Sequence, residues 1–345
     1  MQGDPRIHLF LFHDGPRAGL PYQIADAVEF VTKENTRALY WEQVWLPLML
    51  RDRRVPLYHA TNNTGLPWCY PGRKVVTIHD VIPLLFPDAV PNQLRRFRLT
   101  NTLRIDARIA DAVITVSEAS RNDIVEHTGI RREKIDVIWS TNLAAAAPGE
   151  DRLSNDDREM LAIPSGYFLH NGGIDPRKNI GRLLRAYRTF AGQARVKDHR
   201  LVITGRSTTP FAREMAEYAS ELGVDRSVVF TGEILSGLVQ RLVNSAEIVL
   251  YPSLLEGFGL PILEAMKAGV PVITSNLSSM REIAGGAAYL VDPYSESEIA
   301  GAMVDLHRHP NKRQALVRSG KRWVQLNSAR DMMRSTTEIY FRGIA

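Results

Sequence analysis

The stretch "LLEGFGLPILEAMKAG", residues 254–269, follows a β-branched run and leads through a glycine turn into an apolar helix. Glu256 stands before the turn and Glu264 on the helix. Pro261 suits the first turn of a helix, where its missing N–H has no partner to lose. Gly269 suits the left-handed residue that ends such a helix. The stretch therefore predicts a strand, a tight turn and a short helix.

The turn has the chemistry of a phosphate site. Gly257 and Gly259 let the backbone approach a ligand closely, and a helix N-terminus presents unpaired N–H groups and a partial positive charge. A phosphate repels a carboxylate, so we expect Glu256 and Glu264 to accept hydrogen bonds from the hydroxyls of sugar and ribose rings. A phosphate flanked by polyols describes a nucleotide sugar. Spacing alone leaves open a tight strand-to-helix connection whose acids are solvated.

A second motif, "HNGGIDPRKN" at 170–179, places a strand end, two glycines and two cations before a predicted helix. Arg177 and Lys178 lie on the loop, where they can reach a diphosphate, Arg in a bidentate manner and Lys as a point charge. Asn179 is a candidate N-cap. Taken alone, the motif also fits a solvated basic loop. The expected apolar face of the helix is made of Ile180, Leu183, Leu184 and Tyr187.

Short β-branched runs alternate with helical stretches along the whole chain, which predicts parallel sheets in doubly wound layers of the Rossmann type. The segment 140–160 lacks a strand pattern and is expected to link two such domains. Ligands bind at the carboxyl ends of the strands in such sheets, so both domains should offer loops to one cleft. The expected strands cover 7–12, 55–60, 74–80, 111–117, 134–139, 166–172, 200–205, 227–232, 247–253 and 270–275.

Composition narrows the class of protein. The chain has 345 residues, 44% of them hydrophobic and 23% charged, and its net charge is +5. This charge is mild for a nucleic-acid binder, and the chain carries no aromatic and basic RNA motif. The single cysteine, Cys69, excludes an internal disulfide and a cysteine-rich metal site. We expect a cytoplasmic protein, because no apolar run is long enough to span a membrane and the N-terminus lacks the features of a signal peptide.

Together the motifs resemble the retaining glycosyltransferases of family 4, which have the GT-B fold. "PSLLEGFGLPILEAMKAGVPVITSN" is similar to the acid-seven-acid motif of that family, and "GGIDPRKN" to its arginine–lysine phosphate loop. "VVTIHDVIPLLFP" at 75–87 resembles the acceptor domain of its bacterial mannosyltransferases. The resemblance implies an acceptor-binding domain at 1–155, a nucleotide-sugar-binding domain at 156–325, and a C-terminal helix at 326–345 that crosses back to the first domain.

The resemblance also implies a role for each matching residue. Glu256 would contact the donor sugar and its reacting face, and His79 would stand near the anomeric carbon; these two are the expected catalytic residues. Gly15 would belong to the glycine loop after the first strand, although three residues separate it from Gly19 where the family often has adjacent glycines. Glu264 would hold the ribose. The full set expected to bind the donor is Gly15, Gly173, Arg177, Lys178, Phe258, Gly259, Leu260 and Glu264.

The implied reaction is transfer of a hexose, with GDP-mannose as the expected donor, to a saccharide acceptor linked to a polyprenyl carrier in bacterial O-antigen or exopolysaccharide assembly. The departing phosphate would accept the acceptor proton on the front face. No Asp-X-Asp motif stands in the expected context, so we expect metal-independent transfer without a cofactor. Two alternatives stay open: a sugar-nucleotide epimerase, and a non-catalytic nucleotide-sugar-binding protein of the same fold. The Gly-X-Gly-X-X-Gly fingerprint of a dehydrogenase is absent after the first strand.

Two further features need a decision between function and structure. His13, His59, His79 and His170 all end predicted strands, and only His79 has the motif context that favours catalysis. The predicted helix at 91–110 carries five arginines among apolar residues. Such a helix fits either a solvated face over a core stripe or a peripheral contact with anionic lipid on the inner face of the plasma membrane.

Overall fold

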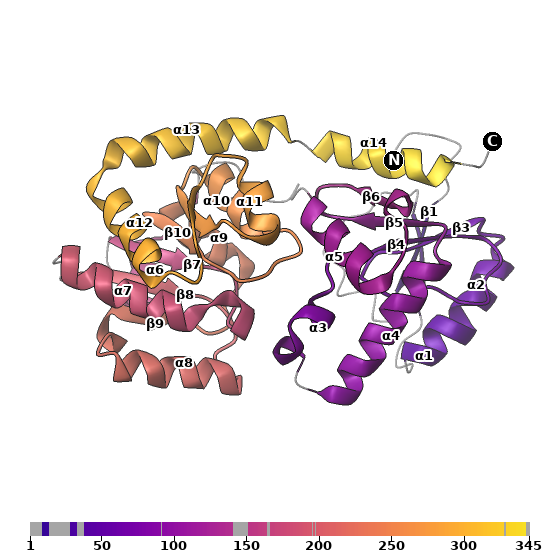
Figure 1. Cartoon of the computed structure of the whole chain (residues 1–345), viewed down its shortest axis with the longest axis horizontal. Coiled ribbons are helices and arrows are strands. Elements are labelled where there is room, and N and C mark those ends of the chain that lie inside the picture. Colours follow the sequence, from indigo (N-terminus) through magenta and orange to yellow (C-terminus); the bar gives the residue numbers. More distant parts are fainter. Residues whose placement is uncertain are drawn as a thin grey trace.

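The computed structural model describes residues 9–13, 28–32, 38–90, 92–140, 151–163, 166–194, 196, 198–327 and 329–342. The described residues form two α/β domains, with the last two helices running along one side of both (Figure 1). Gly15 and residues 141–150 of the predicted linker lie outside the described residues. Among the described residues, no helix is both long and apolar enough to cross a membrane.

The first domain is built on parallel strands. β3, β4, β5 and β6 form one sheet in that order, and β1 pairs with β2 in a separate parallel ribbon. The sequence did not predict β2. The strands are β1 (Leu9–His13), β2 (Val28–Thr32), β3 (Leu57–Ala60), β4 (Arg73–Thr77), β5 (Ala112–Thr115) and β6 (Ile135–Val137). The α-helices are α1 (Ala38–Tyr40), α2 (Leu46–Asp52), α3 (Ile82–Leu85), α4 (Gln93–Ile109) and α5 (Glu118–Thr128), with a π-helical turn at Trp41–Trp45 between α1 and α2.

The second domain has a six-stranded parallel sheet in the order β12-β11-β10-β7-β8-β9. Each new strand is added beside its predecessor or on the far side of the first, as in a doubly wound layer. The strands are β7 (Gly166–His170), β8 (His199–Ile203), β9 (Val228–Phe230), β10 (Ile248–Tyr251), β11 (Val272–Ser275) and β12 (Tyr289–Val291). The helices are α6 (Asn155–Met160), α7 (Ile180–Ala194), α8 (Pro210–Glu221), α9 (Ser236–Ser245), α10 (Leu260–Ala268), α11 (Ser278–Ala284), α12 (Glu296–Arg308) and α13 (Pro310–Leu326).

Alternating side chains of the second sheet bury both of its faces. Phe168 of β7 packs with the helices α7 and α12 on one face, while Tyr167 and Leu169 pack with α9, α10 and α11 on the other. This division follows from the two-residue period of a strand. The predicted apolar face of α7 is confirmed, because all four of its expected residues are fully buried. The sequence did not predict β12, a three-residue edge strand.

The chain crosses between the domains near residues 140 and 328. Inside the predicted linker, residues 155–160 are helical as α6, and Leu153 is buried in the core of the second domain. The capping box of α6 joins Ser154 and Asp157. The last helix, α14 (Ala329–Phe341), returns to the first domain, where Ile339 packs against the apolar face of its sheet (Figure 1).

Candidate active site

The loop after β7 carries the two predicted phosphate-binding cations. β7 ends at His170, and Pro176–Lys178 form a short 3-10 turn. The Asp175 side chain caps this turn by accepting from the backbone N–H of Arg177 at 3.1 Å. The Arg177 carbonyl then accepts from the N–H of Leu254 at 2.8 Å, which fastens the loop to the segment after β10. The two predicted motifs are therefore adjacent in space.

Glu256 joins both cations. Its Oε2 lies 2.6 Å from a terminal nitrogen of Arg177, and its Oε1 lies 2.6 Å from Lys178 Nζ. The exposed fraction is 8% for Glu256 and 4% for Lys178. Charges this deeply buried need partners and hydrogen bonds, because removal from water is otherwise too costly. Burial raises the pKa of Glu256, but the charges of Lys178 and Arg177 outweigh it and hold that pKa below its usual range.

Tyr251, at the end of β10, completes this cluster and was not predicted from the sequence. Its hydroxyl lies 2.9 Å from Lys178 Nζ. Its ring stacks on His170 with centroids 6.0 Å apart, and it limits the space above Gly172, where a Cβ would approach the Tyr251 ring to 2.6 Å. Gly173 is different, because a Cβ there would meet no atom within 4 Å and its φ is +81°. Gly173 therefore leaves free space where a side chain would stand, on the loop that carries the two cations.

The glycine turn has the predicted form. Gly259 has φ +111° and precedes α10, Pro261 stands in its first turn, and Gly269 ends it with φ +74°. The serine hydroxyls of α11 fix the turn by donating to the carbonyl of Glu256, from Ser278 at 3.0 Å and from Ser279 at 2.8 Å. The backbone conformation that the sequence predicted for this turn is confirmed, while its binding of a phosphate stays a prediction.

Loops of the two domains meet at Gly257. A Cβ on Gly257 would lie 2.5 Å from the carbonyl oxygen of His79, so only glycine fits. The Gly257 carbonyl accepts from Ser117 Oγ at 2.7 Å and from Ser120 Oγ at 2.9 Å. His79 and Ser117 follow β4 and β5, so the carboxyl ends of the first-domain strands face the Glu256 cluster. This is the arrangement expected for a ligand site of doubly wound domains.

His79 lies at this junction, where one ring nitrogen and its backbone N–H each have a hydrogen-bond partner. Its Nε2 is 2.9 Å from the carbonyl of Thr61, and its backbone N–H donates to Asn63 Oδ1 at 2.6 Å. A carbonyl only accepts, so Nε2 is the donor in this contact. Burial raises the pKa of the adjacent Asp80, partly offset by an N–H from Ile82 and the charge of Arg177.

Comparison with known proteins identifies the family. Residues 155–323 match the model described as glycosyl transferases group 1, and residues 5–140 match the model described as glycosyltransferase family 4. Between them the two models span both domains. The chain belongs to this family of glycosyltransferases.

Named relatives and solved structures agree. The chain is 32% identical to the O-antigen chain mannosyltransferase B of Escherichia coli, over 73% of this chain and 64% of the relative. It is 25% identical to the O-antigen chain mannosyltransferase RfbU of Salmonella typhimurium, over 69% of this chain and 62% of the relative. The chain thus spans less than two thirds of either relative. Sucrose-phosphate synthase from Thermosynechococcus elongatus superposes with a TM-score of 0.73 at 20% identity, covering 97% of this chain and 88% of that one. The fold is GT-B.

The remaining residues that the sequence predicted to bind the donor lie around the turn. Phe258 is buried and packs edge-to-face on Trp139 of the first domain, with ring centroids 5.9 Å apart, so its side chain serves the domain contact and only its backbone is available to a ligand. Leu260 is half-buried at the start of α10. Glu264 is half-buried one turn further along the same helix. Its role at the ribose stays a prediction.

A carboxylate of the second domain occupies a helix end of the first, which the sequence did not predict. Glu282 of α11 accepts from the N–H groups of Glu118 and Ala119 at the start of α5, at 2.9 Å and 3.3 Å. It also accepts from Trp139 Nε1 at 3.2 Å. The N-terminus of a helix favours a negative charge. This contact therefore fixes α5, and with it Ser117 and Ser120, against the second domain.

Three other polar side chains that the sequence singled out have structural contacts, and the capping role predicted for one of them, Asn179, is wrong. His170 is fully buried, and burial lowers its pKa to about 4, so it is a neutral core residue between the carbonyls of Leu250 and Gly173. His59 lies between the hydroxyl of Tyr340 in α14, at 2.6 Å, and that of Thr77 in β4, at 2.7 Å. The Asn179 amide donates to the carbonyls of Pro252 and Pro293, and its Oδ1 accepts from the Arg182 side chain, so the predicted capping bond is replaced. The side chain of His13 lies outside the described set.

The helix predicted at 91–110 extends over Gln93–Ile109 as α4, with Asn92 as its N-cap. Its second half packs on the core through Leu103. Its first half does not, because Leu94 is 79% exposed and Phe97 is 69% exposed. Of the two alternatives left open, the core stripe is therefore present only in the second half of α4. Arg95 and Arg98 are exposed beside these two apolar side chains.

Proposed function

We propose that the protein transfers a hexosyl group from a nucleotide-diphosphate sugar to a saccharide acceptor. The observation that carries the proposal is the cluster of Arg177, Lys178 and Glu256 at the carboxyl edge of the second sheet, directly opposite the loop of His79. Two fixed cations beside an open glycine backbone suit a diphosphate, and the carboxylate suits sugar hydroxyls.

Each part of the site has a role in the transfer. Arg177 and Lys178 stabilise the negative charge that grows on the nucleoside diphosphate as the glycosidic bond to phosphate breaks. In the retaining, front-face course that we propose, the departing phosphate oxygen takes the proton of the acceptor hydroxyl. Glu256 orients the sugar through its hydroxyls, and His79 lines the acceptor side. No protein nucleophile enters this course. Transfer without a metal cofactor stays a prediction, tested by activity in excess chelator.

We infer mannose as the transferred sugar and GDP-mannose as the donor. Two relatives are named O-antigen chain mannosyltransferases, and these names support a place in O-antigen or exopolysaccharide assembly. The acceptor in this proposal is a saccharide on a polyprenyl carrier. Product analysis with GDP-mannose, UDP-glucose and ADP-glucose tests the donor. Nuclear magnetic resonance of the product's anomeric proton tests retention.

The decisive variants are Arg177→Ala and Lys178→Ala. Removal of a charge that stabilises a transition state costs roughly a hundredfold or more in turnover, so each variant should lose at least that much. Lys312→Ala is the matched control, because Lys312 is exposed, pairs with Asp305 and lies far along the chain on α13. Turnover close to the parent value in both site variants would show that this loop does not bind the diphosphate.

The same assay separates the two alternatives. An epimerase releases nucleoside diphosphate from the donor without an acceptor, whereas a transferase releases it in proportion to the acceptor supplied. A non-catalytic binding protein takes up the donor and releases nothing. Release that depends on the acceptor supports transfer, and release of equal rate without an acceptor supports the epimerase.

Contact with a membrane is a further part of the proposal. The exposed Leu94 and Phe97 of α4, with Arg95 and Arg98 beside them, suit the interface of an anionic bilayer. In a sedimentation assay, the parent chain should be found in the pellet with vesicles that contain phosphatidylglycerol. The double variant Leu94→Ser and Phe97→Ser should bind less than a quarter as much, and equal binding of parent and variant would refute this contact.

A further inference from the structure

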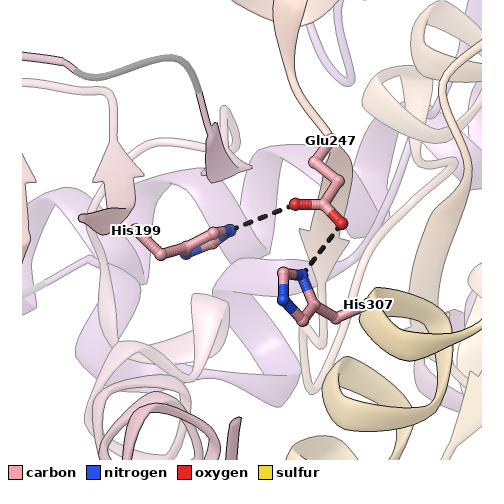
Figure 2. Close-up of side chains that lie close together, drawn as sticks. All are labelled: His199, Glu247 and His307. Atoms are coloured by element: carbon pink, nitrogen blue, oxygen red, sulfur yellow. Dashed lines mark hydrogen bonds and ion pairs between the residues drawn. The ribbon is translucent and has the colours of Figure 1, made fainter. Parts of the chain in front are cut away.

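A second polar cluster lies at the amino ends of the strands of the second-domain sheet, opposite to the Glu256 cluster. His199 begins β8, Glu247 directly precedes β10, and His307 stands in the last turn of α12. Figure 2 shows the two imidazole rings directed at the two oxygens of the one carboxylate. Glu256 follows the other end of β10, so the two clusters are separated by roughly the length of that strand, about 13 Å for its four residues.

The distances in this cluster suit a small cation. His199 Nε2 is 3.3 Å from Glu247 Oε2, and His307 Nδ1 is 3.0 Å from Glu247 Oε1. One ligand atom from each of the three residues lies within 4.8 Å of the others. Tetrahedral zinc with bonds of about 2.0–2.2 Å places its ligand atoms about 3.4 Å apart. Two histidines and a glutamate are a known ligand set for zinc, and they leave a fourth position for water.

The surroundings of His199 are apolar, and hydrogen bonding does not satisfy it. Its ring is 4.2 Å from that of Phe168 and 5.3 Å from that of Phe190, and its side chain is 4% exposed. Its Nε2 faces the Glu247 carboxylate at the long distance of 3.3 Å, and within the described part of the chain its Nδ1 has no hydrogen-bond partner. A buried polar atom without a good partner is costly. A metal bond at Nε2 would replace this long contact with a short one.

Solvent access to Glu247 and the charge beside it are also compatible with a bound cation. Glu247 lines an open hollow of about 530 Å³ beside α13, which neither histidine lines. The His307 and Glu247 side chains are 26% and 19% exposed, so an ion can reach them from solvent. Arg313 lines the same hollow, with a terminal nitrogen 3.2 Å from Glu247 Oε1. That nitrogen also donates to the carbonyl of His307 at 2.8 Å. Arg313 is thus the counterion of Glu247 when no metal is bound, and it competes with one.

We propose that His199, Glu247 and His307 form a binding site for a divalent transition metal, with zinc as the best fit. The metal would join the amino ends of β8 and β10 to the end of α12. Its role is to fasten this helix to the sheet, away from the residues assigned to transfer. The site is therefore independent of the proposed function, and metal-independent chemistry at Glu256 is compatible with it.

The test is zinc binding to the full chain, without an affinity tag, in a Cys69→Ser background, because the exposed thiol of Cys69 is itself a zinc ligand. Titration calorimetry should give one zinc per chain. Zinc at a hundred times its dissociation constant should raise the midpoint of thermal unfolding by about 5–10 °C relative to chelator-treated protein. No measurable binding, or binding without a thermal shift, would overturn the proposal.

Variants locate the metal. His307→Gln should weaken zinc binding by roughly a hundredfold or more, since even residues outside the ligand shell are worth ten- to a hundredfold. His309→Gln is the matched control, because His309 is exposed, lies two residues away and pairs with Asp305. An equal loss in both variants would mean that surface histidines hold the zinc, and would overturn the assignment.

Arg313→Gln gives a result of opposite sign. Removing the competing cation should tighten zinc binding by about threefold or more, because like charges near one carboxylate repel. The unfolding midpoint of the zinc-free variant should fall, since Glu247 loses its counterion. If Arg313→Gln leaves zinc affinity unchanged or weaker, the three side chains are an ion-pair network with Arg313 and not a metal site.

Discussion

Replacing Glu256 with glutamine tests the central ion pair of the site. Glutamine keeps the size and one acceptor oxygen but removes the charge that faces Arg177 and Lys178 at 2.6 Å each. Breaking a buried ion pair lowers the free energy of unfolding by about 3–5 kcal/mol. Because glutamine retains one acceptor oxygen, we expect a loss of about 3 kcal/mol for this variant. For a domain of this size, 1 kcal/mol corresponds to about 2–4 °C. The unfolding midpoint should therefore fall by about 6–12 °C.

The assay is thermal unfolding followed by circular dichroism, with Glu233→Gln as the matched control. Glu233 pairs with Arg206 at 3.5 Å, but both side chains are more than 60% exposed. Such a surface pair contributes at most about 1 kcal/mol, so the control should fall by no more than about 4 °C. A fall for Glu256→Gln no larger than that of the control would refute the buried ion pair.

The pH dependence gives an independent check on Glu256. Its pKa is lowered in the folded protein, so its contribution to stability is present above the ordinary carboxyl pKa and disappears as pH falls through the lowered value. The difference in unfolding free energy between parent and Glu256→Gln should thus be largest near pH 7 and shrink below about pH 4.5. Turnover should fall in the variant, while affinity for the bare nucleoside diphosphate should not, because Arg177 and Lys178 lose a competing carboxylate.

Three further predictions follow from other residues of the site and core. His79→Ala should lower transfer while leaving calorimetric affinity for the nucleoside diphosphate intact, and an equal loss of both would make His79 a nucleotide contact. Glu264→Gln should weaken the binding of the nucleoside diphosphate by about 1.5–3 kcal/mol. Unchanged binding would show that Glu264 does not contact the ribose. His59 and His170 have pKa values lowered to about 4, so their protonation favours the unfolded chain. Stability to urea should decline from pH 6.5 toward pH 4, by up to about 3 kcal/mol for each histidine, and His59→Gln should flatten this decline; a parent curve without slope in that window would contradict the assignment.

Sequence periodicity was enough for most of the fold because buried parallel strands are continuous β-branched runs. Ten expected strands correspond to described ones, with ends shifted by a few residues. β2 escaped prediction because "VEFVT" places a charge inside a short run, and β12 because the three-residue run "YLV" has a single β-branched residue.

For the site, sequence reasoning found Arg177, Lys178 and Glu256 but not their mutual pairing. It treated the carboxylate only as a group that a phosphate repels, whereas two buried cations also need a counterion of their own. Tyr251 escaped because a tyrosine at a strand end is usually a core residue. Glu282 escaped because its partner is a helix end in the other domain, 164 residues away along the chain, and no local pattern records such a contact.

The return of α14 to the first domain has a consequence for synthesis. Arg73 donates to the carbonyl of Ile339, which is 266 residues later in the chain. At about 5–20 residues per second, a ribosome needs roughly 13–53 s to cover that separation. During this time the sheet face of Val75, Ala112 and Ile114 has no α14 to cover it. The emerging chain therefore carries an exposed apolar surface while its second domain is being translated, and a chaperone that binds such surfaces has its natural target there.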